Sequence, residues 1–346
     1  MRAIRFLLFP FAVLYDLVSR LRNYFYDIGV FKSTSFDIPI IVVGNLSVGG
    51  TGKSPQIEYL IRLLQKNTKV NVLSRGYKRK TDGFVLINKS HTAEDVGDEP
   101  LQFFKKFPSI SVAVDANRVN GIQELKNKVN PDIVLLDDAF QHRKVQADFY
   151  VLLTKYDDLY ADDFLLPTGN LRESRSGARR ANVIVVTKCP NNLSQTKQLE
   201  IKVKLKLSPN QELFFSTIDY HAKTGGKQQI SLEKLSEYEI VLVTGIANPT
   251  PLLEFLSSKK CKVHHLSFSD HHNFSAQEIV NIQTKFDTLI SDKKILLTTE
   301  KDYMRLSDKI ADLSYIEIET KFLENQEDFD SIFLNSKNQN NKPTVV

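Results

Sequence analysis

A glycine-rich segment that ends in Lys53 and Ser54 has the residue types and the spacing of a phosphate-binding loop. Its glycines allow backbone angles that turn successive N–H groups toward one phosphate. The ammonium group of Lys53 would reach the β- and γ-phosphates of a nucleotide, and the hydroxyl of Ser54 would bind Mg²⁺. Ser47 stands where the strict pattern has glycine, a departure that the glycines after it offset. We expect the nucleotide-binding residues to be Val48, Gly49, Gly50, Thr51, Gly52, Lys53 and Ser54.

Two carboxylates, Asp137 and Asp138, end the apolar run Ile133–Leu136. Acids at the carboxyl end of a buried parallel strand lie where open α/β sheets bind ligands. This is the place of a Walker-B acid, which positions Mg²⁺ against the phosphates. We therefore predict Ser54, Asp137 and Asp138 as metal ligands, and the sequence leaves open which of the two acids binds the ion directly.

Further short motifs follow the loop in an order that resembles the tetraacyldisaccharide 4′-kinase (lipid A 4′-kinase) family, whose own P-loop carries Ser or Thr at the position of Ser47. The resemblance extends over residues 35–305. The motifs that carry it are Val43–Pro55, Leu73–Tyr77, Gly97–Pro100, Asp115–Arg118, Asp137–His142, Leu171–Glu173, Asp270–His272 and Thr299–Asp302.

This resemblance implies a P-loop kinase that uses ATP and Mg²⁺ to phosphorylate the 4′-hydroxyl of a tetraacyl glucosamine disaccharide 1-phosphate. The product would be the bis-phosphorylated lipid A precursor, of the lipid IVA type, on the way to lipopolysaccharide. The acceptor is a membrane glycolipid, so the resemblance also implies a peripheral protein on the cytoplasmic face of the bacterial inner membrane. We expect a monomer.

The resemblance also implies catalytic roles for Asp98, Lys53 and His271. Asp98 would take the proton of the 4′-hydroxyl as a general base, and His271 would pair with it from the second domain. From the residues alone, Asp98 and Glu99 could instead complement the dipole of a helix that starts near Pro100. The two adjacent histidines could equally form a solvated turn, and adjacency does not decide whether His271 or His272 pairs with the acid.

Basic side chains that follow predicted strand ends or turns could hold the phosphates of ATP or of the acceptor, because guanidinium groups bind phosphate oxygens in pairs. A run of charges is otherwise typical of a solvated face. We predict substrate contacts at Arg75, Arg118, His142 and Arg172.

Composition limits the alternatives. The chain has 346 residues, is 42% hydrophobic and carries a net charge of +5, which suits anionic partners without choosing among them. Its two cysteines form no disulfide framework or zinc motif, which favours a reducing compartment such as the cytoplasm. No sequence signature of a nucleic-acid-binding module is present, so we expect no nucleic-acid partner.

Residues 1–31 form a basic, aromatic-rich segment in which apolar residues recur at helical spacing. No small-x-small cleavage site follows its apolar core, which argues against a signal peptide. We interpret the segment as an amphipathic helix in a membrane interface, although a helix packed on its own domain would show the same pattern.

After residue 31, short apolar runs alternate with stretches of helical period, a pattern that predicts an α/β fold with mostly parallel sheets covered on both faces. We expect two α/β/α sandwich domains, the first resembling P-loop NTPases, plus the N-terminal amphipathic helix. The expected parts are a membrane-interface helix at 1–31, a P-loop kinase domain at 32–210, an inter-domain connection at 211–235, a second α/β domain at 236–334 and a disordered tail at 335–346.

Two other functions are compatible with the loop alone. A P-loop kinase or ligase acting on a soluble small molecule would make no use of residues 1–31. A GTP-dependent switch would need an [NT]-K-x-D motif, but the nearest candidate, Thr187–Pro190, lacks the aspartate. The D-x-x-G switch motif is also missing, since Phe140 stands at the third position after Asp137.

Overall fold

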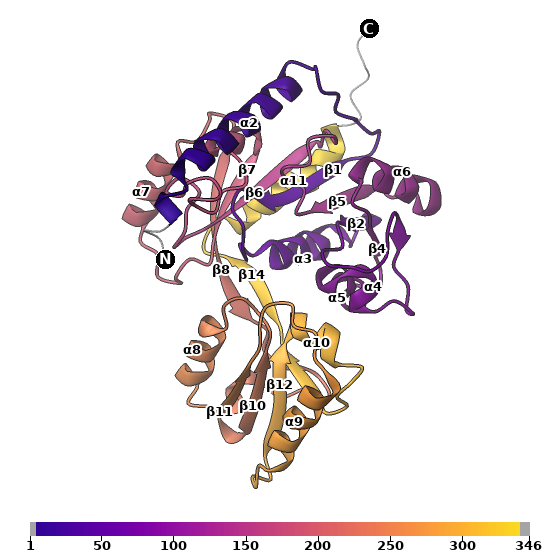
Figure 1. Cartoon of the computed structure of the whole chain (residues 1–346), viewed down its shortest axis with the longest axis vertical. Coiled ribbons are helices and arrows are strands. Elements are labelled where there is room, and N and C mark those ends of the chain that lie inside the picture. Colours follow the sequence, from indigo (N-terminus) through magenta and orange to yellow (C-terminus); the bar gives the residue numbers. More distant parts are fainter. Residues whose placement is uncertain (1–4, 340–346) are drawn as a thin grey trace.

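A computed structural model describes residues 5–339 and contains two β-sheets, one of nine strands and one of five (Figure 1). The first and last residues of the chain, 1–4 and 340–346, belong to the expected membrane segment and the expected tail and lie outside the described residues. The α/β class and the mostly parallel sheets predicted from the sequence are confirmed.

The nine-stranded sheet has the order β14-β8-β7-β6-β1-β5-β2-β4-β3. Its neighbours are parallel from β8 to β4, and only the edge strands β14 and β3 pair antiparallel. The strands are β1 (Ile40–Asn45), β2 (Val70–Ser74), β3 (Val85–Leu86), β4 (Ser111–Val114), β5 (Ile133–Asp137), β6 (Phe149–Lys155), β7 (Val183–Thr187), β8 (Glu212–Tyr220) and β14 (Ile318–Phe322).

Helices cover both faces of this sheet, because successive side chains of a strand point to opposite faces. In β1, Ile41 and Val43 join one apolar cluster while Ile40 and Val42 join another. The first cluster contains residues of α3 (Lys53–Leu64), α5 (Asp98–Lys106) and α11 (Gln326–Gln339), next to the short α4 (Ala93–Val96). The second contains residues of α6 (Arg118–Val129), α7 (Gln195–Leu205) and the 3₁₀ helix η1 (Arg175–Arg180).

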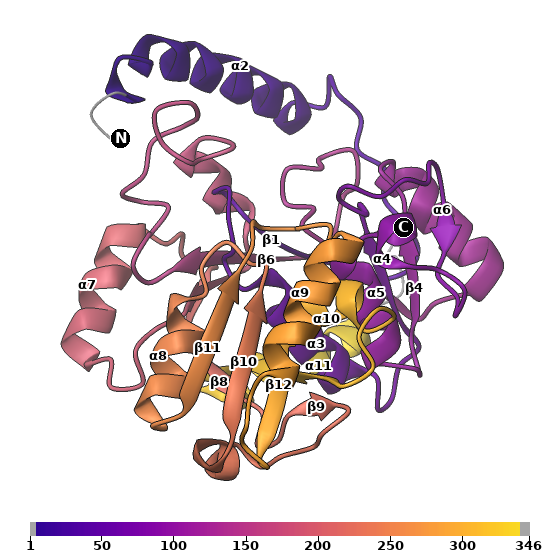
Figure 2. The same cartoon turned by 60° about the horizontal axis from the view of Figure 1, so that its bottom comes forward.

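The five-stranded sheet has the order β11-β10-β12-β13-β9 and is parallel apart from β9 (Figure 2). One face packs on α9 and α10, and the other packs on α8 and the 3₁₀ helix η2. These elements are β9 (Gly225–Gly226), η2 (Leu232–Glu237), β10 (Glu239–Thr244), α8 (Thr250–Ser258), β11 (Lys262–Ser267), α9 (Ala276–Asp287), β12 (Lys294–Thr299), α10 (Glu300–Leu306) and β13 (Leu313–Ile316).

Strand pairing differs from the expected division of the chain at two places. The segment 211–235, expected as a connection, contributes β8, which pairs in parallel with β7 inside the first sheet. The segment 236–334 contains β14, which returns and pairs with β8, and the following α11 packs against α3. The reason is that β8 and β14 form one antiparallel ribbon leading to and from the second sheet, and its apolar side chains complete the first core. Helix α11 also continues to Gln339, past the expected start of the tail.

Helix α2 (Phe9–Asp27) lies on the outside of the molecule, above the loops that precede η1 (Figures 1 and 2). Within it only Ala12 is buried, and most of its large apolar side chains are exposed. Among residues 5–339, no helix combines the length and the apolar character that crossing a bilayer requires.

Candidate active site

The glycine-rich loop joins β1, a fully buried strand, to the start of α3 at Lys53. Gly49 and Gly52 have φ angles of +107° and +87°, in the left-handed region where a Cβ atom would strain the backbone. Because the loop runs directly into the first residue of α3, the positive N-terminal end of this helix faces the loop, an arrangement that binds anions.

Neighbouring strands hold this loop from its outer side. The hydroxyl of Thr187 donates a hydrogen bond of 2.8 Å to the carbonyl oxygen of Thr51, and Lys188 Nζ donates one of 2.8 Å to that of Gly50. The backbone N–H of Val48 donates to the carbonyl oxygen of Asn170 over 2.8 Å. The bonds from Thr187 and Lys188 engage the carbonyl oxygens of Thr51 and Gly50, whose partial negative charge would otherwise be unfavourable near a phosphate. In the sequence, Thr187 and Lys188 stand out only as an incomplete base-selection motif, and nothing local indicates that they support the loop.

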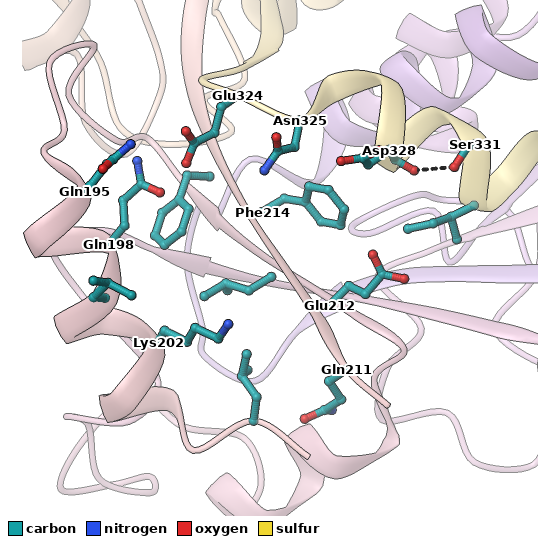
Figure 3. Close-up of a pocket in the computed structure, with 15 residues that line it drawn as sticks. Gln195, Gln198, Lys202, Gln211, Glu212, Phe214, Glu324, Asn325, Asp328 and Ser331 are labelled. Atoms are coloured by element: carbon teal, nitrogen blue, oxygen red, sulfur yellow. Dashed lines mark hydrogen bonds between the residues drawn. The ribbon is translucent and has the colours of Figure 1, made fainter. Parts of the chain in front are cut away.

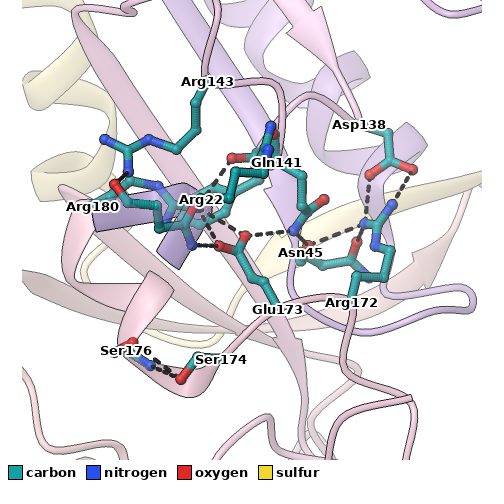
Figure 4. A network of polar contacts seen from close by, with 12 residues as sticks. Arg22, Asn45, Asp138, Gln141, Arg143, Arg172, Glu173, Ser174, Ser176 and Arg180 are labelled. Carbon is teal, nitrogen blue, oxygen red and sulfur yellow. Dashed lines mark hydrogen bonds and ion pairs between the residues drawn. The ribbon is translucent and has the colours of Figure 1, made fainter. Parts of the chain in front are cut away.

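Lys53, Asp138 and Arg172 form one network at the mouth of the loop, and Figure 4 shows its contact between Asp138 and Arg172. Lys53 Nζ lies 3.6 Å from Asp138 Oδ2 and 3.4 Å from Asn45 Oδ1. The guanidinium group of Arg172 binds both carboxylate oxygens of Asp138, at 2.8 and 3.2 Å. Burial acts to raise the pKa of Asp138, but the charges of Lys53 and Arg172 outweigh it and hold that pKa below its usual value. Asp138 is thus ionised and already paired.

Asp137 has the opposite environment. It is the last residue of β5, and its Oδ2 accepts a hydrogen bond of 2.9 Å from the hydroxyl of Ser74. Burial, and then the charge of Asp138, raise the pKa of Asp137 to about 6. A buried carboxylate whose burial is only partly offset by the charge of Lys53 and the hydrogen bond of Ser74 fits a bound cation, and hydroxyl and carboxylate oxygens are the donors that Mg²⁺ prefers.

Asp98 and His271 meet from different sheets. Asp98 is the first residue of α5, after Gly97 with a φ of +94°, and its side chain is almost completely buried. His271 Nδ1 lies 2.8 Å from Asp98 Oδ2, and Arg305 Nε donates to Asp98 Oδ1 over 2.5 Å. Burial acts to raise the pKa of Asp98, but the hydrogen bonds from His271 and Arg305 together lower it. His272 instead contacts Glu278 at 3.0 Å.

The remaining basic candidates gather near the two acids. Arg118 is buried and donates to the carbonyl oxygens of Asp115, at 2.6 Å, and of Asp137, at 3.4 Å. Burial lowers the pKa of Arg118 to about 10. Burial, followed by the charge of Arg118, lowers the pKa of His142 to about 4, so His142 is neutral. Arg75 is exposed, and its charge contributes to lowering both pKa values.

A second polar network ties the site to α2 (Figure 4). Glu173 accepts hydrogen bonds from Arg180 at 2.8 Å, from Gln141 at 2.9 Å and from Asn23 of α2 at 3.1 Å. The same Gln141 amide donates to the carbonyl oxygen of Asn45 at 2.8 Å. Glu173 belongs to the motif Leu171–Glu173, but its role could not be predicted from the sequence, because Asn23 and Gln141 lie 150 and 32 positions away along the chain.

A groove of about 670 Å³ lies elsewhere, between α7, β8 and α11 (Figure 3). Its walls include Gln198, Lys202, Phe214 and Asp328, and none of the predicted site residues lines it. The candidate active site is therefore separate from this groove.

Comparisons with known proteins agree with one another. The model of a family described as "Tetraacyldisaccharide-1-P 4'-kinase" matches residues 4–338. A tetraacyldisaccharide 4′-kinase of Flavobacterium johnsoniae is 54% identical, aligned over 99% of this chain and 100% of that protein. One of Bacteroides thetaiotaomicron is 44% identical over 93% of this chain and 90% of its own length. The fold is similar to a crystal structure of LpxK from Aquifex aeolicus in complex with ATP, with a TM-score of 0.77, 30% identity and coverage of 96% and 98%.

Proposed function

The chain belongs to the tetraacyldisaccharide-1-P 4′-kinase family, and from this premise we propose how its residues divide the reaction. The activity is the ATP-dependent phosphorylation of the 4′-hydroxyl of a tetraacyl disaccharide 1-phosphate, a step of lipid A biosynthesis. The assignment of roles rests on one observation, the 2.8 Å contact between Asp98 and His271. This contact joins the second sheet to the first turn of α5. Glu99 lies in the same turn, and its negative charge helps to raise the pKa of Asp137, although burial and the charge of Asp138 contribute more.

The backbone N–H groups of Gly49–Ser54 bind the phosphates of ATP, and Lys53 neutralises charge on the β- and γ-phosphates. Val48 instead anchors the start of the loop, because its N–H donates to the carbonyl oxygen of Asn170. Ser54, Asp137 and Asp138 hold Mg²⁺, which would neutralise the phosphate charge that builds up during transfer. Arg172 keeps Asp138 and Lys53 in place through its paired hydrogen bonds. ATP binding is supported by the similar structure with ATP.

Asp98 acts as the general base. As the 4′-oxygen bonds to the γ-phosphorus, the bond from that phosphorus to the β–γ bridging oxygen breaks, ADP leaves, and the hydroxyl proton passes to Asp98. Both oxygens of Asp98 accept hydrogen bonds, and its side chain is only 1% exposed. The acceptor hydroxyl therefore reaches this carboxylate only when the surrounding residues move apart, which couples transfer to an opening and closing of the site.

The acceptor enters from a membrane surface on which α2 rests. Large apolar side chains cover this helix, and among them Leu14, Leu17, Val18 and Leu21 are 49–63% exposed at the spacing of one helical face. Tyr15 and Asn23 bind Arg172 and Glu173 at the site. Arg75, His142 and Arg172 provide contacts for the acceptor and its 1-phosphate, and the buried Arg118 supports the site by binding the backbone of Asp115 and Asp137. We place the protein, as a monomer, on the cytoplasmic face of the inner membrane, where ATP is available.

Mass spectrometry of the product tests this proposal. Incubation with ATP, Mg²⁺ and a tetraacyl disaccharide 1-phosphate in vesicles should add one phosphate to the distal glucosamine, and Lys53→Met should abolish the gain. A soluble glucosamine disaccharide should be a much poorer acceptor. Equal phosphorylation of the soluble sugar would contradict the proposed entry from the membrane.

A further inference from the structure

Arg305 joins the two halves of the Asp98–His271 pair. It lies on α10, and its side chain is 12% exposed. Its Nε donates to Asp98 Oδ1 over 2.5 Å, while its NH1 donates to the carbonyl oxygens of His271 at 3.1 Å and His272 at 3.3 Å, and also to Asn273 Oδ1. One guanidinium group thus binds the carboxylate from one sheet and the loop backbone from the other.

The loop that Arg305 holds has an unfavourable backbone. His271 has a φ of +58°, in the left-handed region that residues other than glycine seldom adopt. Such a conformation persists only where its surroundings fix it. Here the N–H of His271 donates to Gly245 over 3.1 Å, and its carbonyl oxygen accepts from Arg305. Without Arg305, the carbonyl oxygens of His271 and His272 lose a charged donor, and the imidazole ring of His271 is no longer held in one orientation.

Lys301, one turn earlier on α10, determines which nitrogen of His271 carries the proton. Lys301 Nζ lies 3.0 Å from His271 Nε2, and an ammonium group can only donate. Nε2 therefore accepts, and the proton of the neutral ring sits on Nδ1, which donates to Asp98 Oδ2. Each oxygen of Asp98 thus accepts one hydrogen bond, Oδ1 from Arg305 and Oδ2 from His271.

We propose that Arg305 is a positioning residue of the phosphoryl transfer, which fixes the carboxylate of Asp98 and the turn of His271 in a single arrangement. The inference rests on the proposed role of Asp98 as the general base. In addition, two hydrogen-bond donors that belong to the second sheet and its helices, His271 and Arg305, orient the carboxylate of Asp98, and Arg305 carries a permanent charge. The charged and titratable groups around the pair are Arg305, Lys301 and Asp302 on α10, Asp270 and His271 on the loop between β11 and α9, Glu99 on α5, and Tyr77, whose ring lies 5.5 Å from that of His271.

The fold does not depend on Arg305 alone. Helix α10 also docks on α5 through the contact of Glu300 with Lys106, at 2.8 Å, near the other end of both helices. A variant at Arg305 should therefore remain folded, which makes its kinetics interpretable.

The test compares Arg305→Gln and Arg305→Lys with Lys309→Gln. Lys309 donates to the carbonyl oxygen of Phe274, in the same loop, at 3.1 Å, so it supports this loop through a group other than Asp98. Rates are measured against pH at saturating ATP and acceptor. Arg305→Gln should lower kcat by about 10²-fold, the cost of a small misplacement of reacting groups. It should also move the acidic limb of the profile to higher pH, because the pKa of Asp98 rises when a positive donor is lost.

Arg305→Lys should recover part of the rate and keep the acidic limb near its original position, since an ammonium group can still reach Asp98. Lys309→Gln should leave the limb unchanged. An Arg305→Gln enzyme whose acidic limb stays in place, or whose loss is matched by Lys309→Gln, would show that Arg305 is only structural.

The Asp98→Asn variant separates this inference from the proposed function. If Asp98→Asn keeps the full rate, the general-base role itself fails. If Asp98→Asn is inactive while Arg305→Gln is normal, only the positioning role fails. In the double variant, loss of Arg305 should cause little further decrease, because both changes remove one interaction.

Discussion

Lys106 Nζ and Glu300 Oε1 lie 2.8 Å apart, and their contact joins the last turn of α5 to the first residue of α10. Glu58 and Glu317 approach the same ammonium group at 2.7 and 2.8 Å, and Arg62 is the second cation nearby. Three carboxylates thus share two cations in a largely buried cluster. Burial, and then the charge of Glu58, raise the pKa of Glu300 to about 8.

This cluster predicts a pH-dependent stability. The pKa of Glu300 is 4.5 without its surroundings, so between pH 4.5 and about 8 the folded protein keeps a proton that the unfolded chain releases. Stability therefore falls as pH rises through this range. Glu300→Gln mimics the protonated form and should show a smaller fall of Tm between pH 5.5 and 8 than the wild type. The exposed Glu233→Gln is the control, and equal slopes in all three proteins would contradict the prediction.

Asp137→Asn should stabilise the empty protein and inactivate it. The raised pKa of Asp137 indicates a buried charge that Lys53 and Ser74 offset only in part, so its removal should increase Tm by roughly 2–4 °C in the absence of Mg²⁺ and ATP. The stabilisation by Mg²⁺ and ATP together should be lost with the activity. Asp138→Asn should have the opposite effect on the empty protein and lower its Tm, because Lys53 and Arg172 lose their partner. Thermal melts of both variants with and without Mg²⁺–ATP test this prediction. If Mg²⁺–ATP raised the Tm of Asp137→Asn as much as that of the wild type, a metal-binding role of Asp137 would be ruled out.

Asp98→Asn should reduce kcat by about 10²–10⁴-fold while the Kd for ATP stays the same, because the amide cannot take a proton. His271→Gln should also slow transfer, and His272→Gln should have little effect, since His272 contacts Glu278 rather than Asp98. Single-turnover rates and ATP titrations provide the measurements. A normal rate with a lowered Tm would mean that Asp98 serves only the start of α5.

Polar substitutions on the exposed face of α2 should weaken membrane binding. Leu17→Asn combined with Leu21→Asn removes apolar area from that face, and vesicle sedimentation should show less bound protein. Turnover of acceptor in vesicles should fall, whereas turnover of detergent-dispersed acceptor should change little. Ile290→Asn is the control, because Ile290 is 98% exposed but belongs to the loop after α9. Unchanged sedimentation of the α2 variant would contradict a membrane-facing role for this helix.

The amino-acid sequence by itself determined the features that depend on neighbours along the chain. The order of apolar strand, glycines, Lys53 and helix identified the loop, since these residues are joined by covalent geometry and local backbone preference. The acids that end β5 were found in the same way, and the alternation of strands and helices gave the α/β class.

Only the tertiary structure decided how those parts face one another. Asp98 lies 173 positions from His271 and 207 from Arg305, so no local spacing could select His271 over His272 or reveal Arg305. The difference between Asp137 and Asp138 likewise depends on Arg172, which arrives from a distant loop. Strands β8 and β14 join the first sheet because pairing and burial, rather than order along the chain, determine which core a strand completes.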